Sequence, residues 1–152
     1  MQAETGFYEY FDIKPAVQDV AAEVLAGLEQ SPRSVSPKYF YDAKGSELFE
    51  AITQLPEYYL TRTELALIDQ YLPEIAGRLA GPLCVVEYGS GSSLKIRRLL
   101  ATLTPTAYVP VDISSEHLQD NARTLHRDFP GLHVYPVCAD ITRPLQLPDD
   151  VL

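Results

Sequence analysis

The sequence predicts an α/β fold: a parallel sheet of the doubly wound class, preceded by a helical N-terminal segment. Residues 1–80 carry helical periodicity, whereas residues 81–152 alternate apolar runs of strand length with amphipathic stretches. A strand–helix–strand–helix–strand order is typical of parallel strands joined by right-handed crossovers. We therefore expect a division near residue 80, with the helical segment before it and half of a ligand-binding α/β domain after it.

Three helices and no strand are expected in the first part. Apolar residues recur at three- and four-residue steps over 15–28, and a second helix should open at Gly45 and Ser46. That second helix is expected to bury four apolar side chains: Leu48, Phe49, Ile52 and Leu55. Thr61 and Glu64 match the T-x-x-E capping box, so the third helix should begin there with Glu64 occupied as its cap.

The second part is expected to hold three strands. They are predicted over 83–88, 107–111 and 132–138, with helices over 94–103 and 115–129 between them. The first run is continuously apolar, which is typical of a strand buried on both faces of a sheet. Cys84 and Cys138 lie inside such runs, so we expect both thiols to pack in the core as small apolar groups.

An acidic residue stands at the end of each predicted strand: Glu87, Asp112 and Asp140. Ligands of doubly wound sheets bind beyond the carboxyl ends of the strands, so these three carboxylates are candidate ligand contacts. Gly89 and Gly91 follow the first strand and permit a tight turn with close backbone approach. Asp112 comes about 20 residues after Gly91, the spacing at which a carboxylate meets the hydroxyls of a ribose. The expected ligand is therefore a nucleoside.

The loop after the first strand discriminates between nucleoside ligands. The sequence contains no G-x-x-x-x-G-K-[ST] string, and Leu94 stands where a dinucleotide site places its third small residue. S-adenosylmethionine, an adenosyl group without phosphate, fits better, with Glu87 near its charged tail, Asp112 on the ribose and Asp140 near the adenine. Two alternatives stay open: a nicotinamide-type dinucleotide site, and glycines that only shape a turn beside acids that cap helices.

Composition disfavours several classes of partner. The net charge is −9 and the 12 Lys and Arg residues are scattered, which argues against nucleic acid and anionic lipid. No apolar run approaches the roughly 20 residues of a membrane span, so a cytoplasmic protein is expected. His117, His126 and His133 stand apart from one another, so no metal site is predicted, and the first two are interpreted as solvated surface.

Longer strings resemble one known family. They are SPKYFYDAKGSELFEAITQLPEYYLTRTE over 36–64, VVEYGSGSSLK over 85–95, YVPVDIS over 108–114 and VCADIT over 137–142. Together they resemble the histidine-specific, S-adenosylmethionine-dependent methyltransferases that make hercynine for ergothioneine synthesis. The resemblance implies a Rossmann-like class I methyltransferase sheet and methyl transfer to the α-amine of L-histidine.

The resemblance also implies which residues hold the cofactor. Gly89, Lys95 and Asp112 match the family's cofactor contacts. Asp140 and Ile141 match its Asp-Phe pair at the adenine, and Ile in place of Phe keeps apolar contact without an aromatic face. Without the resemblance, Lys95 would be interpreted as a surface lysine in the first turn of a helix.

Two tyrosines are implied at the amino-acid substrate. Tyr41 and Tyr58 match tyrosines that line the family's substrate pocket, although packing alone would place them between the helices and the sheet. Tyr59, Arg62 and Glu64 are assigned structural roles. No residue is identified as the group that accepts the proton of the amine.

The number of strands gives a last expectation. In the usual strand order 3-2-1-4-5 the strand over 83–88 is central, so three strands alone would leave it at an edge. We therefore expect the chain to be the N-terminal half of an enzyme, inactive alone, and to form a homodimer through the exposed edge. Two alternative functions stay open: a methyltransferase of another amino acid or small amine, and a non-catalytic module that interacts with another chain through this edge.

Overall fold

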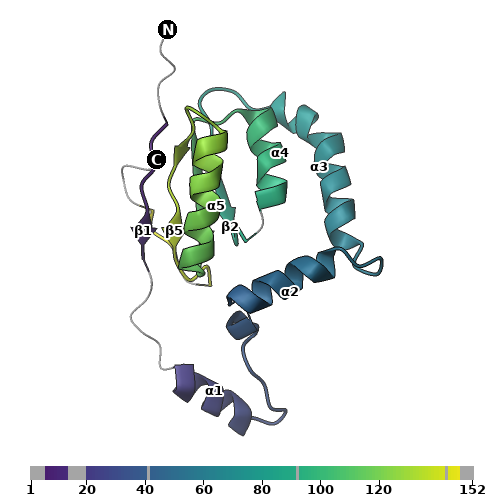
Figure 1. Ribbon diagram of the computed structural model, residues 1–152, viewed down its shortest axis with the longest axis vertical. Helices are drawn as coiled ribbons and strands as arrows, with labels where there is room; N and C mark the ends of the chain where they lie inside the picture. The colour runs from purple at the N-terminus through teal and green to yellow at the C-terminus, as the bar shows by residue number, and fades with distance from the viewer. Residues whose placement is uncertain (1–5, 14–19, 41, 92, 143, 148–152) are drawn as a thin grey trace.

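The computed structural model describes residues 6–13, 20–40, 42–91, 93–142 and 144–147. It contains a parallel sheet with helices against one face and further helices beside them (Figure 1). Its strands are β1 (Phe11–Asp12), β2 (Cys84–Tyr88), β3 (Ala107–Asp112), β4 (His133–Val134) and β5 (Val137–Cys138). The order is β1-β5-β3-β2, with β4 also paired to β3 and every pairing parallel. The predicted α/β class and the edge position of the 83–88 strand are confirmed.

The expectation of helices and loops alone before residue 80 is wrong, because β1 lies in this part and pairs with β5. Backbone N–H groups of Phe11 and Ile13 donate to the carbonyls of Pro136 and Cys138, both at 2.9 Å. The hydroxyls of Tyr10 and Ser115 are hydrogen bonded at 2.7 Å and tie β1 to the helix that crosses the sheet. The first residues described therefore cover the β5 edge.

The predicted third strand is divided into β4 and β5. Tyr135 and Pro136 separate the two pieces, and Pro136 has no backbone N–H to give to a neighbouring strand. Tyr135 still donates its N–H to the carbonyl of Tyr108 at 2.9 Å, so the chain stays beside β3 through the break. The interruption therefore leaves the direction of the strand unchanged.

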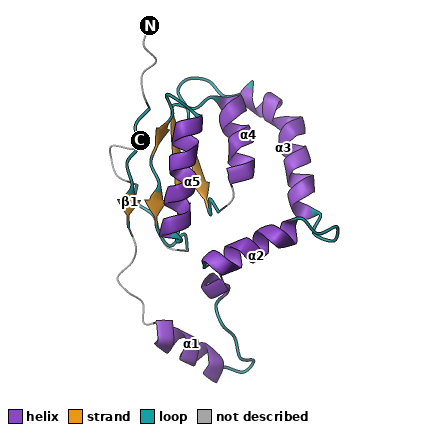
Figure 2. Cartoon of the chain, viewed as in Figure 1, coloured by secondary structure: helices purple, strands orange, loops and turns teal. Residues whose placement is uncertain are grey.

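Helices α4 (Ser93–Leu103) and α5 (Ser115–Asp128) lie on the same side of the sheet (Figure 2). The predicted inner face of α5 is confirmed, because Leu118, Ala122 and Leu125 are buried. Two apolar clusters form the core, one on each face of the sheet. The helical face gathers Ile96, Leu100, Tyr108, Ala122, Leu125, Leu132 and Val134, and the opposite face gathers Val109, Val111, Val137 and Ala139.

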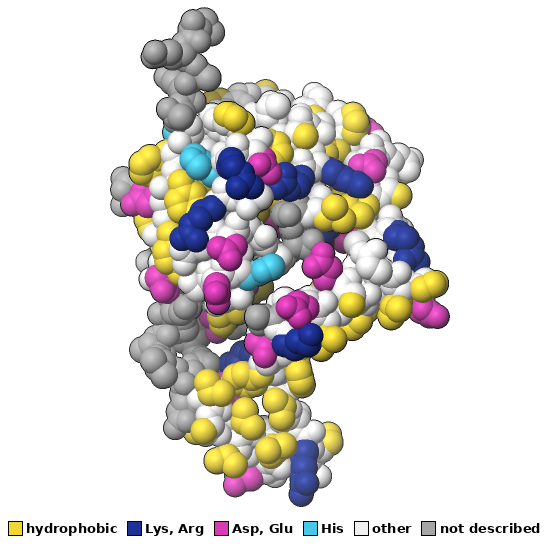
Figure 3. All heavy atoms as spheres, in the orientation of Figure 1, with side chains coloured by type: hydrophobic (Ala, Val, Ile, Leu, Met, Phe, Trp, Pro, Cys, Tyr) yellow, Lys and Arg dark blue, Asp and Glu magenta, His cyan; other side chains and the backbone are white. Residues whose placement is uncertain are grey.

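The N-terminal helices are α1 (Val20–Glu29), the 3₁₀ turn η1 (Pro37–Phe40), α2 (Ala43–Thr53) and α3 (Leu60–Ala76). Among the described parts of these helices, the close packing on the α/β part is that of α3 against α4. The burial predicted for α2 is wrong: Leu48, Phe49, Ile52 and Leu55 are 54%, 45%, 43% and 49% exposed. Among the described residues, α1 has no fully buried side chain. Apolar side chains accordingly show on the surface around α1 and α2 (Figure 3).

The capping box predicted for α3 is absent from the described residues. The helix begins at Leu60, one residue before Thr61, and Tyr59 occupies its N-cap position with no side-chain capping bond among described groups. Arg62 ties this end of the helix to the preceding loop, since its guanidinium donates to the carbonyls of Leu55 and Pro56 at 2.9 and 2.7 Å. Glu64 is thus left for another contact.

Strand β2 is less covered than its apolar sequence predicts. Its side chains alternate between exposed and half-buried, so it is not buried on both faces. Cys84 is exposed, against the expectation of a core thiol, whereas Cys138 in β5 is buried as expected. Val85 and Glu87 face the helices α3 and α4, whereas Cys84, Val86 and Tyr88 alternate with them on the other, exposed face of the strand. None of the described helices is long and apolar enough to cross a bilayer.

Candidate functional site

The glycine turn follows β2 directly and opens onto unfilled space. Gly89 has φ of +76°, a left-handed conformation that glycine adopts without strain. Its N–H donates to the carbonyl of Val111 at 2.8 Å, which ties the turn to the end of β3. A Cβ added at Gly89 or at Gly91 would meet no described atom within 4 Å. The turn is therefore fixed at its base and accessible to a ligand.

Helix α5 holds the far end of this turn. The carbonyl oxygen of Gly91 lies 2.5 Å from Nε2 of His117 and accepts from Nδ2 of Asn121 at 3.1 Å. His117 is exposed, as predicted, but its contact with the turn was not predicted. The spacing of four residues between His117 and Asn121 is the signal that places both on one helix face. The other histidine interpreted as solvated, His126, is half-buried beside Tyr8, with ring centroids 5.8 Å apart.

The predicted acids Asp112 and Asp140 lie at the carboxyl ends of the strands. Asp112 ends β3, and Asp140 follows β5 by two residues. In each case Oδ1 accepts the backbone N–H two residues ahead, from Ser114 at 2.9 Å and from Thr142 at 3.0 Å. The N–H of Ala139 donates to the carbonyl of Asp112 at 3.0 Å and joins the two acid-bearing turns. Both carboxylates are therefore oriented by their own turns.

Glu87, the third acid, lies in a more apolar environment inside β2. Its carboxylate accepts a hydrogen bond of 2.5 Å from the hydroxyl of Tyr108 on β3. Burial raises the pKa of Glu87, while the bond from Tyr108 and the charge of Lys95 act in the opposite direction. Burial also raises the pKa of Tyr108, with the negative charge of Glu87 adding to the effect. The phenol therefore stays protonated and donates to the carboxylate.

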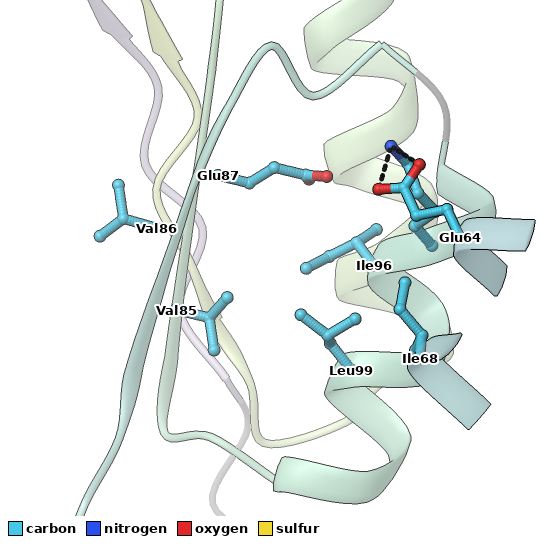
Figure 4. Close-up of a pocket in the computed structure, with 8 residues that line it drawn as sticks. Glu64, Ile68, Val85, Val86, Glu87, Ile96 and Leu99 are labelled. Carbon is cyan, nitrogen blue, oxygen red and sulfur yellow. Dashed lines mark hydrogen bonds and ion pairs between the residues drawn. The ribbon is translucent and has the colours of Figure 1, made fainter. Parts of the chain in front are cut away.

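A pocket of about 170 Å³ lies between β2, α3 and α4. Val85, Ile68, Ile96 and Leu99 form its apolar side, whereas Glu87, Lys95 and Glu64 supply charged groups (Figure 4). Val86 also lines it, although its side chain points to the other face of the strand. The Nζ of Lys95 lies 3.2 Å from both carboxylate oxygens of Glu64, so Glu64 pairs across the helices instead of capping α3.

The structure describes some of the residues predicted to contact the substrate and the adenine. Tyr58 is half-buried just before α3, with its ring edge-on to that of Phe49 at 6.0 Å between centroids. Ile141 is 47% exposed beside Asp140. Tyr41 lies outside the described residues. The described side chains include no group of three His, Cys, Asp or Glu residues arranged to hold a metal ion.

Comparisons with known proteins agree with this geometry. The family described as "Histidine-specific methyltransferase, SAM-dependent" matches residues 20–150. Histidine N-alpha-methyltransferase of Mycolicibacterium smegmatis is 38% identical over 135 residues, covering 86% of this chain and 42% of the relative. The protein of the same name from Mycobacterium tuberculosis is 39% identical over 122 residues, covering 78% of this chain and 38% of the relative.

A relative with lower identity is named for ergothioneine biosynthesis. Ergothioneine biosynthesis protein 1 of Neurospora crassa is 33% identical over 127 residues, covering 78% of this chain and 14% of that protein. The chain thus spans less than half the length of each of these relatives. The match to the family nevertheless extends from α1 through the glycine turn to the acid after β5, and on this evidence the chain belongs to the histidine-specific, S-adenosylmethionine-dependent methyltransferase family.

Proposed function

We propose that the protein to which this chain belongs transfers methyl groups from S-adenosylmethionine to the α-amine of L-histidine, and that this chain binds the cofactor. The observation that carries the proposal is the row of strand-end acids around an open glycine turn. The family match supports it, because that match spans all of these residues. A nicotinamide cofactor is the alternative that the fold alone leaves open.

The described residues suit the parts of the cofactor. We assign Asp112 to the ribose hydroxyls, and Asp140 with Ile141 to the adenine. Gly89 and Gly91 leave space over the turn in which the nucleoside and sulfur fit, since no side chain occupies it among the described residues. When bound, S-adenosylmethionine supplies an electrophilic methyl group.

The charged tail of the cofactor is assigned to the mouth of the pocket beneath the turn. There Glu87 faces the ammonium of the tail and Lys95 faces its carboxylate. The tail carries both charges, so an acid and a base side by side suit it better than either alone. This assignment separates the proposed ligand from a dinucleotide, whose pyrophosphate carries negative charge only.

The chain's contribution to the reaction is alignment. Tyr58, together with Tyr41, is proposed to hold the amino acid so that the lone pair of its amine faces the methyl group in line. Excluding water from this contact strengthens the electrostatic interactions around the reacting atoms. The amine must lose its proton before it attacks, and we assign no residue of this chain to that step.

Calorimetry on this chain tests the cofactor assignment. S-adenosylhomocysteine should bind to the wild type, weakly for the isolated chain, and binding should be lost in Asp112→Ala because the ribose loses its carboxylate. Asp120→Ala, at an exposed position on α5, is the matched control and should bind normally. Binding of NAD with no signal for S-adenosylhomocysteine would favour a nicotinamide cofactor instead.

Steady-state kinetics on the full-length protein test the substrate. Replacing Tyr58 by Ala should raise the KM for histidine much more than the KM for S-adenosylmethionine, because the tyrosine is assigned to the amino acid. Tyr58→Phe separates the hydroxyl from the ring packing against Phe49. Methylation of other amino acids with none of histidine would contradict the substrate assignment.

We also propose a partner copy, a location and a domain division for this protein. A second copy of the chain is proposed to pair on the exposed β2 edge, and the protein is proposed to be cytoplasmic. The division into a helical segment over 1–80 and half of a cofactor domain over 81–152 is likewise proposed, with β1 belonging to the sheet although it lies in the first part. A non-catalytic interaction module would bind a partner at the same edge and show no cofactor binding.

A further inference from the structure

Lys95 shares its pocket with two carboxylates that come from different elements. Its ammonium is 3.2 Å from each oxygen of Glu64 on α3, and its charge acts on Glu87 in β2. All three side chains line the pocket between β2, α3 and α4 (Figure 4). The pocket therefore gathers one basic and two acidic side chains.

The pairing with Glu64 is not needed to hold α3 against α4. One turn further along the same two helices, Arg98 pairs with Asp69 at 2.8 Å and donates to the carbonyl of Leu65 at 3.3 Å. The side chains of Glu64 and Lys95 are 52% and 39% exposed, and ion pairs in such positions contribute little to stability. The clearer consequence of the contact is where it places the ammonium.

A lysine side chain is flexible, so the position of its charge depends on what restrains it. Its ammonium has three N–H donors, and two of them are directed at the two oxygens of Glu64. This fork fixes the ammonium at the pocket and keeps it from collapsing onto Glu87, which Tyr108 already satisfies. A second carboxylate arriving at the pocket would then meet a cation in a defined position.

We propose that Glu64 is a positioning residue that holds Lys95 ready for the carboxylate of the cofactor's amino-acid tail. The inference rests on the proposed function, because it takes the tail of S-adenosylmethionine as the incoming zwitterion. Glu64 acts through Lys95 and touches no reacting atom. If Glu64 has this role, replacing it should weaken the binding of ligands that carry the amino-acid tail and should not affect ligands that lack it.

Two probes that share a nucleoside test this dependence by calorimetry on the chain. S-adenosylhomocysteine has the amino-acid tail, and 5′-methylthioadenosine lacks it. Glu64→Gln should weaken binding of S-adenosylhomocysteine roughly fivefold to tenfold and leave 5′-methylthioadenosine unchanged. Asp69→Asn is the matched control: it breaks the parallel contact between the same helices and should change neither affinity.

A double-mutant cycle asks whether Glu64 acts through Lys95. Lys95→Gln should weaken binding of S-adenosylhomocysteine, and adding Glu64→Gln to it should cost nothing more. Additive losses would mean that Glu64 acts independently and would overturn the proposal. Circular dichroism on each variant shows that the fold is kept.

The outcomes separate this inference from the proposed function. If Glu64→Gln binds S-adenosylhomocysteine as the wild type does, or more tightly, the inference is wrong while cofactor binding stands. An equal loss for both probes would indicate a structural role for Glu64 and would also overturn the inference. If the wild type binds neither probe, the proposed cofactor site is wrong and the inference fails with it.

Discussion

At the scale of single residues, three acids in equivalent positions have different surroundings. Asp112 and Asp140 each accept an N–H from their own turn, whereas Glu87 lies among apolar groups and accepts from Tyr108. Their positions could be predicted from the sequence, because each follows an apolar run. The difference between them could not, since it depends on which side chain of the neighbouring strand reaches the carboxylate, and Tyr108 does so from the position opposite Val85.

The raised pKa of Glu87 predicts a pH dependence of stability. At pH values just above the usual pKa of 4.5, the folded state still holds the proton of Glu87, whereas the unfolded state has released it. The contribution of Glu87 to the free energy of unfolding is therefore present below pH 4.5 and is lost as the pH rises toward the folded-state pKa. Glutamine does not titrate, so the stability of Glu87→Gln relative to the wild type should increase as the pH rises through this range.

Urea unfolding of both proteins between about pH 4 and about pH 8 measures the effect. Glu50→Gln, at an exposed position on α2, is the control and should follow the wild type. A stability difference between Glu87→Gln and wild type that does not change with pH would contradict the prediction.

Glu64 shows where a motif misled the sequence prediction. Thr61 and Glu64 match a capping box, but the helix begins one residue earlier, with Tyr59 at its N-cap position. The carboxylate is then available to a lysine 31 residues away in the sequence. A local pattern cannot indicate a partner that only packing of α3 on α4 brings within reach.

At the scale of elements, the bounds of long, clearly patterned segments were predicted best. The bounds of β3 and α5 agree with their patterns within a residue, and the buried face of α5 was expected. The burial of α2 was not, because an amphipathic pattern shows which face is apolar and does not show that a neighbour covers it. Strand β1 has only two residues, too few to show an alternation.

The bond between Tyr10 and Ser115 should contribute measurably to the docking of β1. Tyr10→Phe removes the hydroxyl and keeps the ring, so unfolding should require about 0.5–1.5 kcal/mol less free energy. Ser115→Ala should have a similar effect, and the double variant should be no worse than either single one. Simple additivity, or no loss in either, would show that this bond does not hold β1.

At the scale of the whole molecule, exposed apolar side chains are unusually prominent. They occur on α1, α2, α3 and the β2 edge, where Val86 and Tyr88 are 37% and 59% exposed. An unpaired edge strand and uncovered apolar surface both favour association with another chain. This exposed surface is the reason why we propose that a second copy of the chain pairs with β2.

Light scattering over a dilution series should show a concentration-dependent assembly. Val86→Lys places a charge on the β2 edge and should shift the molecules toward the monomer, because edge lysines oppose strand pairing. Thr102→Lys, at an exposed position on α4, adds the same charge away from the edge and should leave association unchanged. A wild-type chain that stays monomeric at all concentrations would refute the second copy.

The pairing of β1 with β5 also determines when the sheet can be completed during synthesis. The register joins Phe11 to Val137, which are 137 − 11 = 126 positions apart. At about 5–20 residues per second, the ribosome reaches Val137 roughly 6 to 25 s after Phe11, and β1 has no edge to join before then. Its one apolar side chain, Phe11, therefore has no β5 to pack beside in the nascent chain during that interval. In the finished protein, this late-closing strand should also be the first part of the sheet to open, so the amides of Phe11 and Ile13 should exchange with solvent before those of β3.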